Sequence, residues 1–122
     1  MDPKNVPAHE ALQNRRKFLA DLRCEGWPIL TAKQIHSNGV FVFTGNRENF
    51  TSEIEADALL TRENGLLLGI KTADCLPILV ADQKKRAVAA IHAGWRGTVE
   101  KVTEAALGRM TEEFQSNPVD LV

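Results

Sequence analysis

Two apolar runs separated by a short charged turn constrain the fold of this chain more than any other feature. The first run is LPILVAD (76–82) and the second is RAVAAIH (86–92), with the turn DQKK between their apolar parts. Runs of this length beside a turn predict two antiparallel neighbouring strands. Because neighbouring strands lie roughly 5 Å apart, such a pair brings its outer ends to one place. Cys75 and His92 stand at those ends, 17 positions apart, and are therefore expected to be neighbours in space.

The remaining segments predict two helices and further short strands. Apolar residues at helical spacing predict a helix over Ala8–Leu22, and a second helix follows the segment HAGWRG, with Thr98 as its N-cap. The runs ILTAKQIH and VFVF, with SNG between them, predict a hairpin over residues 29–43. The runs LLLGI and LPILVA are apolar on both faces, which predicts central strands that are covered on both sides. The buried face of the second helix is expected to carry Val99, Val102, Ala106, Met110 and Phe114.

The order of these elements predicts the fold class. A helix, a hairpin, short strands, a second hairpin and a helix favour an α+β fold with mixed, largely antiparallel sheet layers and flanking helices. The last residues, SNPVDLV, are expected to enter another strand. The length of 122 residues predicts a single domain over residues 1–122.

Composition and charge exclude several classes of function. The net charge of −1, from 15 basic and 16 acidic residues, gives no electrostatic reason to expect nucleic acid or a membrane surface as a partner. No window holds the uninterrupted apolar residues of a membrane span, and the first residues lack the apolar core of a secretory signal. The chain has only two cysteines, Cys24 and Cys75, so a disulfide framework is not expected. This low number favours a reducing, cytoplasmic setting.

A histidine upstream turns the Cys75–His92 pair into a possible metal site. His36 also follows a strand-like run, 39 residues before Cys75, and joins the pair if its strand reaches the same edge. Two imidazoles and one thiolate suit zinc with an open fourth position, which is the arrangement of catalytic zinc sites. Copper is an alternative, although neither Met1 nor Met110 is placed as the axial ligand of a blue-copper site. Spacing alone favours a buried structural cysteine and surface or hydrogen-bonded histidines over a metal site.

Two charged residues near these positions are further candidates. Asp74 precedes Cys75 and could orient a ligand histidine or act as an acid or base, or simply cap a turn. Arg96 lies between Gly94 and Gly97 and could hold phosphate oxygens in its guanidinium fork, or form a structural salt bridge.

Four short sequence motifs resemble those of one protein family. KQIHSNGV, EADALLT, TADCLPILV and AIHAGWRGT follow in the order seen in the bacterial laccase-domain family, also called the multicopper-polyphenol-oxidase-like or purine nucleoside phosphorylase family. The resemblance implies zinc bound by His36, Cys75 and His92, and a fold similar to that of cytotoxic-necrotising-factor-type cysteine hydrolases. Members of the family are longer, so the domain is expected to be incomplete at both ends relative to them.

The resemblance also implies a function. We expect a zinc-dependent purine nucleoside enzyme that splits adenosine, inosine or methylthioadenosine with phosphate and possibly deaminates adenosine. The catalytic residues would be Cys75, His92 and Asp74, and Arg96 would bind phosphate. The alternatives are a metal-free cysteine hydrolase or amidase acting on a peptidoglycan precursor, with Cys75 as nucleophile and His92 as base, a copper-dependent polyphenol oxidase, and an inactive fragment.

Overall fold

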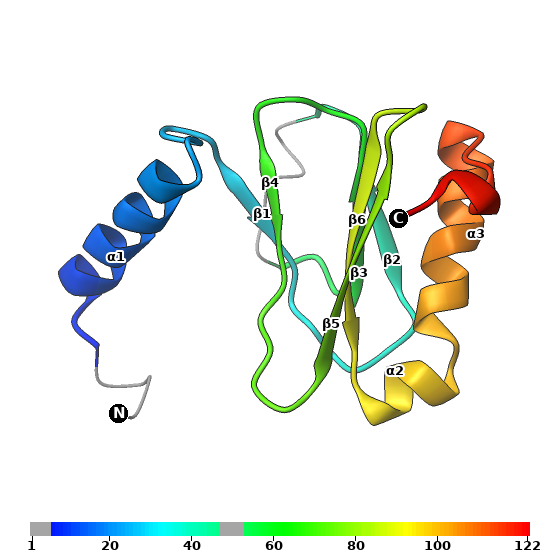
Figure 1. Ribbon diagram of the computed structural model, residues 1–122. Helices are drawn as coiled ribbons and strands as arrows, with labels where there is room; N and C mark the ends of the chain where they lie inside the picture. Colours follow the sequence, from blue (N-terminus) through cyan, green and yellow to red (C-terminus); the bar gives the residue numbers. More distant parts are fainter. Residues whose placement is uncertain (1–5, 47–52) are drawn as a thin grey trace.

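Six strands and three α-helices make up the part of the chain that the computed structural model describes, residues 6–46 and 53–122 (Figure 1). The strands are β1 (Ile29–Thr31), β2 (Val40–Phe43), β3 (Ala58–Thr61), β4 (Leu67–Gly69), β5 (Leu76–Asp82) and β6 (Ala87–Ala93). The helices are α1 (Ala8–Asp21), α2 (Trp95–Val99) and α3 (Val102–Phe114), followed by a 3-10 helix at Pro118–Asp120. The predicted α+β class is confirmed.

The strands form two sheets of mixed orientation. One sheet has the order β2-β3-β6-β5, and the other is the pair β1-β4. β1 runs parallel to β4 and β2 runs parallel to β3, whereas β6 is antiparallel to both β3 and β5. The antiparallel β5–β6 hairpin expected from the DQKK turn is confirmed, but antiparallel pairing does not dominate the fold.

The predicted hairpin over residues 29–43 is wrong. β1 and β2 do not pair with each other, since each takes a parallel partner in a different sheet. The reason lies in the connecting segment, whose backbone N–H groups at residues 35–37 donate to the carboxylate of Asp57. These bonds hold the connection open as a crossing between the two sheets and prevent a tight turn.

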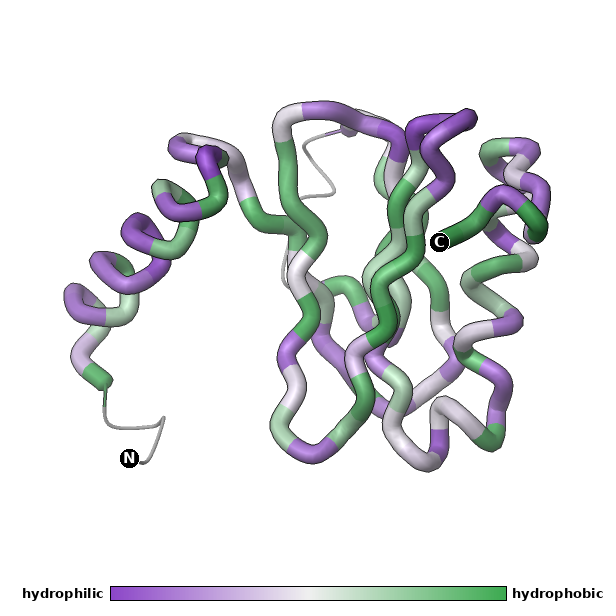
Figure 2. Tube along the Cα trace, viewed as in Figure 1, coloured by the Kyte–Doolittle hydropathy of each residue, from purple (hydrophilic) through white to green (hydrophobic). Residues whose placement is uncertain are grey.

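The strands expected to be central are not the central ones. β5 is an edge strand of the larger sheet, and Leu79 on it is 73% exposed. β4 lies in the two-stranded sheet and is half-buried. The covered strand is β3, where Leu59 and Leu60 are 1% and 0% exposed on opposite faces. Figure 2 shows why composition misleads here, because β4, β5 and β6 are similarly hydrophobic although β5 lacks a neighbour along most of its outer edge.

Two hydrophobic clusters flank β3. The first lies between the larger sheet and α3, and includes Leu60, Ile91, Met110 and Phe114. The second lies between the other face of β3 and the β1–β4 pair, and includes Leu30 and Leu59. The larger sheet is thus covered by α3 on one side and by the smaller sheet on the other (Figure 1).

The helices largely follow the sequence pattern. α1 matches its predicted range within one residue. Among the residues of this helix, Leu19 alone is buried. The second predicted helix is divided into α2 and α3, because Lys101 adopts a left-handed backbone with φ 62° between them. Thr98 therefore lies inside α2 and caps nothing, and Val99 is 74% exposed. The four other predicted core residues of this helix are buried as expected: Val102, Ala106, Met110 and Phe114.

The last residues make a short contact with the edge strand. Val122 exchanges both backbone hydrogen bonds with Ala81, at 2.8 and 3.0 Å, beside a single antiparallel bridge between Leu121 and Asp82. The expected strand is thus a bridge. Within the described residues, no helix has the length and apolar character needed to cross a membrane.

A buried carboxylate at the end of β5 should make stability depend on pH. The nearby Ser116 hydroxyl and the Lys85 N–H, which donates at 3.0 Å, lower the pKa of the Asp82 carboxyl. Burial opposes this effect but is outweighed. The Ser116 hydroxyl does not reach full hydrogen-bond geometry. A lowered folded-state pKa contributes stability above the unfolded pKa that is lost as the pH falls through the folded pKa.

We therefore expect Asp82→Asn to be less stable than the wild type at pH 7, with a difference that shrinks below about pH 4, where carboxyls protonate. Urea unfolding at stepped pH measures this difference. A deficit of equal size at every pH would contradict the assignment.

Candidate metal centre

His92 is fixed by its place on a central strand. It lies near the end of β6, opposite Pro77 of β5, and its side chain is 4% exposed. Its backbone N–H donates to the carbonyl oxygen of Asp57 at 2.7 Å. Its ring Nδ1 lies 2.8 Å from Oδ1 of the same residue. The side chain and the backbone of His92 are thus both held by one neighbour, the residue that precedes β3.

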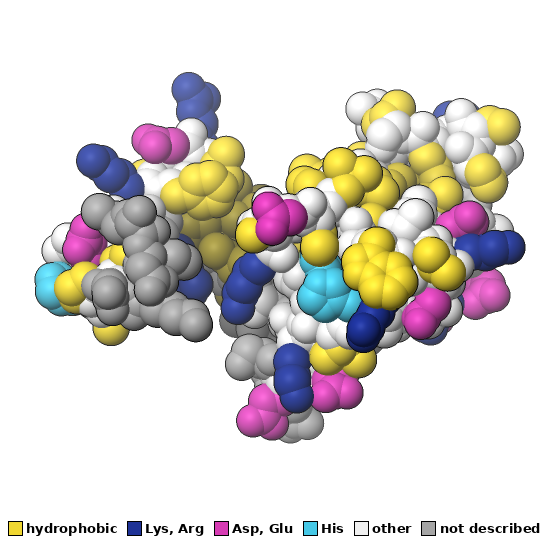
Figure 3. All heavy atoms as spheres, turned by 90° about the horizontal axis from the view of Figure 1, so that it is seen from below, with side chains coloured by type: hydrophobic (Ala, Val, Ile, Leu, Met, Phe, Trp, Pro, Cys, Tyr) yellow, Lys and Arg dark blue, Asp and Glu magenta, His cyan; other side chains and the backbone are white. Residues whose placement is uncertain are grey.

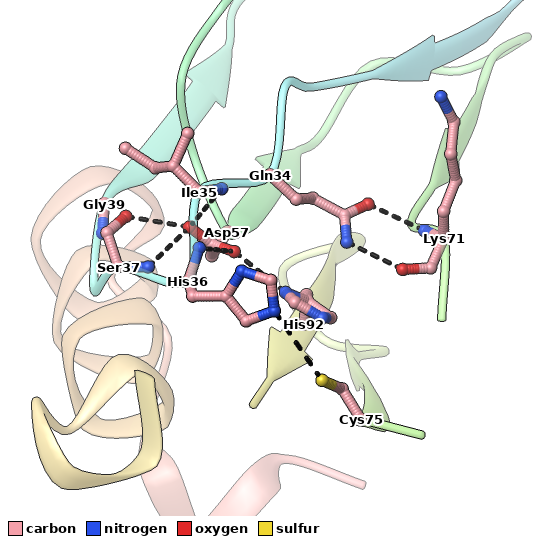
Figure 4. Close-up of polar contacts among 9 residues, drawn as sticks. All are labelled: Gln34, Ile35, His36, Ser37, Gly39, Asp57, Lys71, Cys75 and His92. Carbon is pink, nitrogen blue, oxygen red and sulfur yellow. Dashed lines mark hydrogen bonds and ion pairs between the residues drawn. The ribbon is translucent and has the colours of Figure 1, made fainter. Parts of the chain in front are cut away.

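Asp57 organises the centre (Figure 4). Its side chain is completely buried, and its Oδ1 accepts from the N–H of His36 at 3.0 Å as well as facing His92 Nδ1. Its Oδ2 accepts from the N–H of Ile35 and from the N–H and hydroxyl of Ser37, at 2.8–3.2 Å. Burial raises the pKa of Asp57, but the hydrogen bonds from His92, Ser37 and Ile35 outweigh it and hold the pKa below its ordinary value.

An ionised Asp57 fixes the tautomer of His92. A carboxylate can only accept, so the proton of a neutral imidazole sits on Nδ1 and leaves Nε2 free as a ligand atom. Carboxylate support of a metal-binding histidine is a recurring feature of protein metal sites. Asp57 was not among the residues predicted for the site, although an aspartate directly before a fully buried strand, in the segment EADALLT, is a signal that could have found it.

His36 is held in an unusual backbone conformation. Its φ of 60° lies in the left-handed region, which costs of order 1–3 kcal/mol for a residue other than glycine. The hydrogen bonds from residues 35–37 to Asp57 offset that cost and turn the exposed imidazole toward His92. The two rings meet edge to face, with centroids 5.0 Å apart and an interplanar angle of 75°.

Cys75 completes the cluster from the loop between β4 and β5. Its Sγ lies 3.9 Å from Nε2 of His36, and the ligand atoms of His36, Cys75 and His92 all lie within 4.8 Å of one another. The structure therefore brings together the three residues expected to form the metal site. Seen from below, a histidine lies among hydrophobic and basic (Lys or Arg) side chains on this face of the molecule (Figure 3).

The donor set fits zinc. A tetrahedral zinc with bonds of about 2.0 Å to nitrogen and 2.3 Å to sulfur places neighbouring ligand atoms about 3.3–3.6 Å apart. The observed separations, 3.9 Å for one pair and at most 4.8 Å, need an inward movement of each side chain by a fraction of an ångström. Three protein ligands would leave one coordination position open. His36, Cys75 and His92 line a pocket of roughly 520 Å³ together with Lys33, Gln34, Lys71 and Asp74.

The other two predicted site residues lie differently. Asp74 is exposed and lines this pocket, but the carboxylate bonded to His92 is that of Asp57. Arg96 is exposed on α2 and its guanidinium lies 5.3 Å from the centre of the Trp95 ring, a cation–π contact. Arg96 is not among the described residues that line the pocket.

Gly94 leaves little room for a side chain beside the cluster. A Cβ at this position would lie 3.0 Å from Cδ2 of His36 and 3.2 Å from Sγ of Cys75. We expect Gly94→Ala to displace both ligands and to weaken binding of Zn²⁺ about tenfold, the lower end of the cost of losing a supporting group around a metal.

Zinc titration with a competing chromophoric chelator measures this affinity. Gly108→Ala is the matched control, because a Cβ at this exposed position on α3 meets nothing within 4 Å. The control should keep its zinc affinity and gain about 0.5–1 kcal/mol in stability from the loss of a helical glycine. Equal zinc affinity in the two variants would show that Gly94 is not needed for the geometry of the cluster.

Comparison with known proteins places the chain in a family. A family model described as multi-copper polyphenol oxidoreductase laccase matches residues 5–122. This chain belongs to that family. The resemblance expected from the four sequence motifs is confirmed.

Several curated relatives of this chain are named purine nucleoside phosphorylase. Purine nucleoside phosphorylase of Bacteroides thetaiotaomicron is 56% identical over 66 residues, which are 54% of this chain and 24% of the relative. Purine nucleoside phosphorylase of Deinococcus radiodurans is 34% identical over 110 residues, 90% of this chain and 42% of the relative. A protein named adenosine deaminase RL5, from an unknown prokaryotic organism, is 46% identical over 57 residues, 47% of this chain and 22% of that protein. The chain spans less than half the length of these relatives.

Solved structures support the fold. The crystal structure of Bacillus licheniformis YfiH matches 99% of this chain and 48% of that protein, with a TM-score of 0.84 and 24% identity. YlmD from Geobacillus stearothermophilus matches 99% of this chain and 47% of that protein, with a TM-score of 0.83 and 25% identity. The arrangement of sheets and helices described above is therefore the arrangement found in part of these longer proteins.

Proposed function

We propose that this chain carries the metal-binding part of a zinc-dependent purine nucleoside phosphorylase. The observation that carries the proposal is the cluster of His36, Cys75 and His92 beside an open pocket, with Asp57 fixing His92. It is supported by membership of the laccase family and by relatives named purine nucleoside phosphorylase. The proposed substrates are adenosine, inosine or methylthioadenosine, together with phosphate.

Each residue has a defined task in this proposal. His36, Cys75 and His92 would hold zinc through two ring nitrogens and a thiolate, and Asp57 would keep the Nδ1 proton of His92 in place. A bound zinc would act as a Lewis acid toward an oxygen of the substrate. In the reaction, a phosphate oxygen forms a bond to the anomeric carbon of the ribose while the bond to the purine nitrogen breaks.

The departing purine needs a proton and the phosphate needs positive charge. Asp74, which lines the pocket, is our candidate for moving that proton. Arg96 is our candidate for binding phosphate. Binding would draw its guanidinium away from the face of Trp95. Both roles are part of the proposal and are tested by the same assay with Asp74→Asn and Arg96→Gln.

The test combines metal content with turnover. The purified chain is analysed by elemental mass spectrometry and incubated with inosine and phosphate, and hypoxanthine release is measured with and without a chelator. We expect about one zinc per chain and phosphate-dependent release of hypoxanthine, both lost in Cys75→Ser. Cys24→Ser is the matched control, because the Cys24 thiol contacts the carbonyl of Leu22 at the end of α1, away from the cluster.

The outcomes separate the candidate functions. Full turnover by Cys75→Ser would refute the proposal. Copper in place of zinc, with oxidation of phenols, would favour a polyphenol oxidase. Ammonia release from adenosine would add deamination, the activity in the name of one relative. Absence of both metal and turnover in the wild type would favour an inactive fragment.

A metal-free cysteine hydrolase or amidase is the second candidate. The observation that favours it is the approach of Cys75 Sγ to Nε2 of His36 at 3.9 Å, which places an imidazole beside a thiol. In this arrangement His36 faces the sulfur, whereas sequence reasoning had assigned the base to His92. The expected likeness to cytotoxic-necrotising-factor-type hydrolases belongs to this candidate. Inactivation of an amidase activity by iodoacetamide in the presence of chelator, with an adduct on Cys75, would support it.

A further inference from the structure

The loop that carries Cys75 begins where a parallel ladder stops. β1 and β4 pair from Ile29 opposite Leu67 to Thr31 opposite Gly69, and the ladder ends there. The segments that follow β1 and β4 both continue toward the cluster, the first to His36 and the second to Cys75. Five residues, 70–74, separate Gly69 from Cys75, and the last four of them are exposed. Something other than strand pairing must therefore hold this loop near His36.

The side chain of Gln34 takes over from the ladder. Its Nε2 donates to the carbonyl oxygen of Lys71 at 2.7 Å, and its Oε1 accepts from the N–H of Lys71 at 2.7 Å. The carboxamide thus offers one donor and one acceptor to one residue, as the N–H and C=O of a single residue do in a hydrogen-bonded pair of antiparallel strands. Figure 4 shows the two bonds side by side, between the segment that carries His36 and the chain that leads to Cys75.

These two bonds connect two of the three members of the cluster. Gln34 lies two residues before His36, and Lys71 lies four residues before Cys75. Within the described part of the chain, residues 71–74 have no hydrogen bonds besides the two from Gln34. His36 and His92, in contrast, are both fixed by Asp57. The position of Cys75 is therefore the least restrained of the three.

We propose that Gln34 is a positioning residue that holds the Cys75 loop against the His36 segment, so that the thiol meets both imidazoles. The inference rests on the proposed function only in taking the cluster to be a metal site. Its consequence is preorganisation: without the two bonds, a metal ion would have to order residues 71–75 on binding, and its affinity would fall by that ordering cost.

The test uses Co²⁺ as the probe and the whole chain as the protein. Gln34→Met keeps the length of the side chain and removes both bonds, whereas Gln34→Glu keeps an acceptor for the Lys71 N–H and loses the donor. Asn38→Leu is the matched control, because the Asn38 side chain also donates to a backbone carbonyl, that of Glu100 at 3.1 Å, and not to the loop that carries Cys75. Affinity is measured by titration, and ligation by Cys75 is followed by the thiolate-to-cobalt charge-transfer absorption.

We expect Gln34→Met to bind Co²⁺ about tenfold more weakly with a reduced charge-transfer band, in the range found for groups that support metal ligands. Gln34→Glu should lie between it and the wild type, and Asn38→Leu should match the wild type. Unchanged affinity and absorption in Gln34→Met would overturn the inference. Equal losses in Gln34→Met and Asn38→Leu would also overturn it, because the effect would then be general destabilisation.

Hydrogen exchange separates this inference from the metal proposal. In the metal-free chain, the amide of Lys71 is protected by Gln34 Oε1, so Gln34→Met should speed its exchange and leave β6 unchanged. If the wild type bound no Co²⁺, the metal proposal would fail, and exchange alone would decide the role of Gln34. Equal amide exchange rates of residues 71–75 in the wild type and in Gln34→Met would then refute the positioning role of Gln34.

Discussion

Asp57→Asn should cost this protein about 3–5 kcal/mol in free energy of unfolding, the usual penalty for breaking a buried, hydrogen-bonded charge. The carboxylate is fully buried and all of its partners are donors, on His36, His92, Ile35 and Ser37. An asparagine must point its NH₂ group at the donors of one side or the other, whichever way the amide is turned. The substitution therefore sets donor against donor at a side chain that is completely buried.

The measurement is urea unfolding of the two proteins at pH 7, accompanied by zinc titration. Zinc affinity should fall at least tenfold, because His92 loses the partner that sets its tautomer. Glu55→Gln is the matched control two residues away, since Glu55 is exposed and its pair with Lys33 is a surface contact worth little. A loss below about 1 kcal/mol in Asp57→Asn would mean that the carboxylate does not organise the centre.

Leu60→Ala should remove about 2–5 kcal/mol of stability, the range for truncating a large aliphatic side chain in a packed core. Leu60 is 0% exposed and belongs to the cluster between the larger sheet and α3. Its strand has neighbours on both sides and cover on both faces, so the structure has little freedom to close the cavity.

The same substitution on β5 provides the control. Leu79→Ala should change stability by less than about 0.5 kcal/mol, because Leu79 is 73% exposed. Thermal or urea unfolding of both variants measures the difference. The pair also tests the position of the strands, since equal losses would mean that β5 is as well covered as β3.

Local patterns predicted the parts of the fold that depend on local contacts. The β5–β6 hairpin follows from two apolar runs around a turn, and the buried face of α3 follows from helical spacing. The failures are non-local. β1 and β2 read as a hairpin because they are adjacent in sequence, but each pairs in parallel with a strand from a later segment. A sequence pattern contains no information on such partners, nor on whether an apolar strand such as β5 has a second neighbour.

The candidate site divides along similar lines. His36, Cys75 and His92 could be predicted because histidines and cysteines are few in this chain and these three stand beside apolar, strand-like runs of the sequence. Their supporting groups could not, because Asp57 and Gln34 act through hydrogen bonds to segments far away in sequence. Asp74 was chosen as a supporting carboxylate for its adjacency to Cys75, and adjacency in sequence does not determine which carboxylate reaches a histidine.

The attachment of His92 to Asp57 has a consequence for how the domain opens. The hydrogen bond from the amide of His92 to the carbonyl of Asp57 extends the pairing of β3 and β6, the two inner strands. Cys75, in contrast, lies at the end of an exposed loop. Freeing His92 therefore requires the pairing of β3 and β6 to open at this end, whereas freeing Cys75 requires only a local fluctuation of its loop. An ion that binds all three would enter and leave on the cysteine side. Once bound, it would stabilise the entire domain rather than one loop, because binding free energy at a site that exists only in the folded state adds to the global free energy of unfolding.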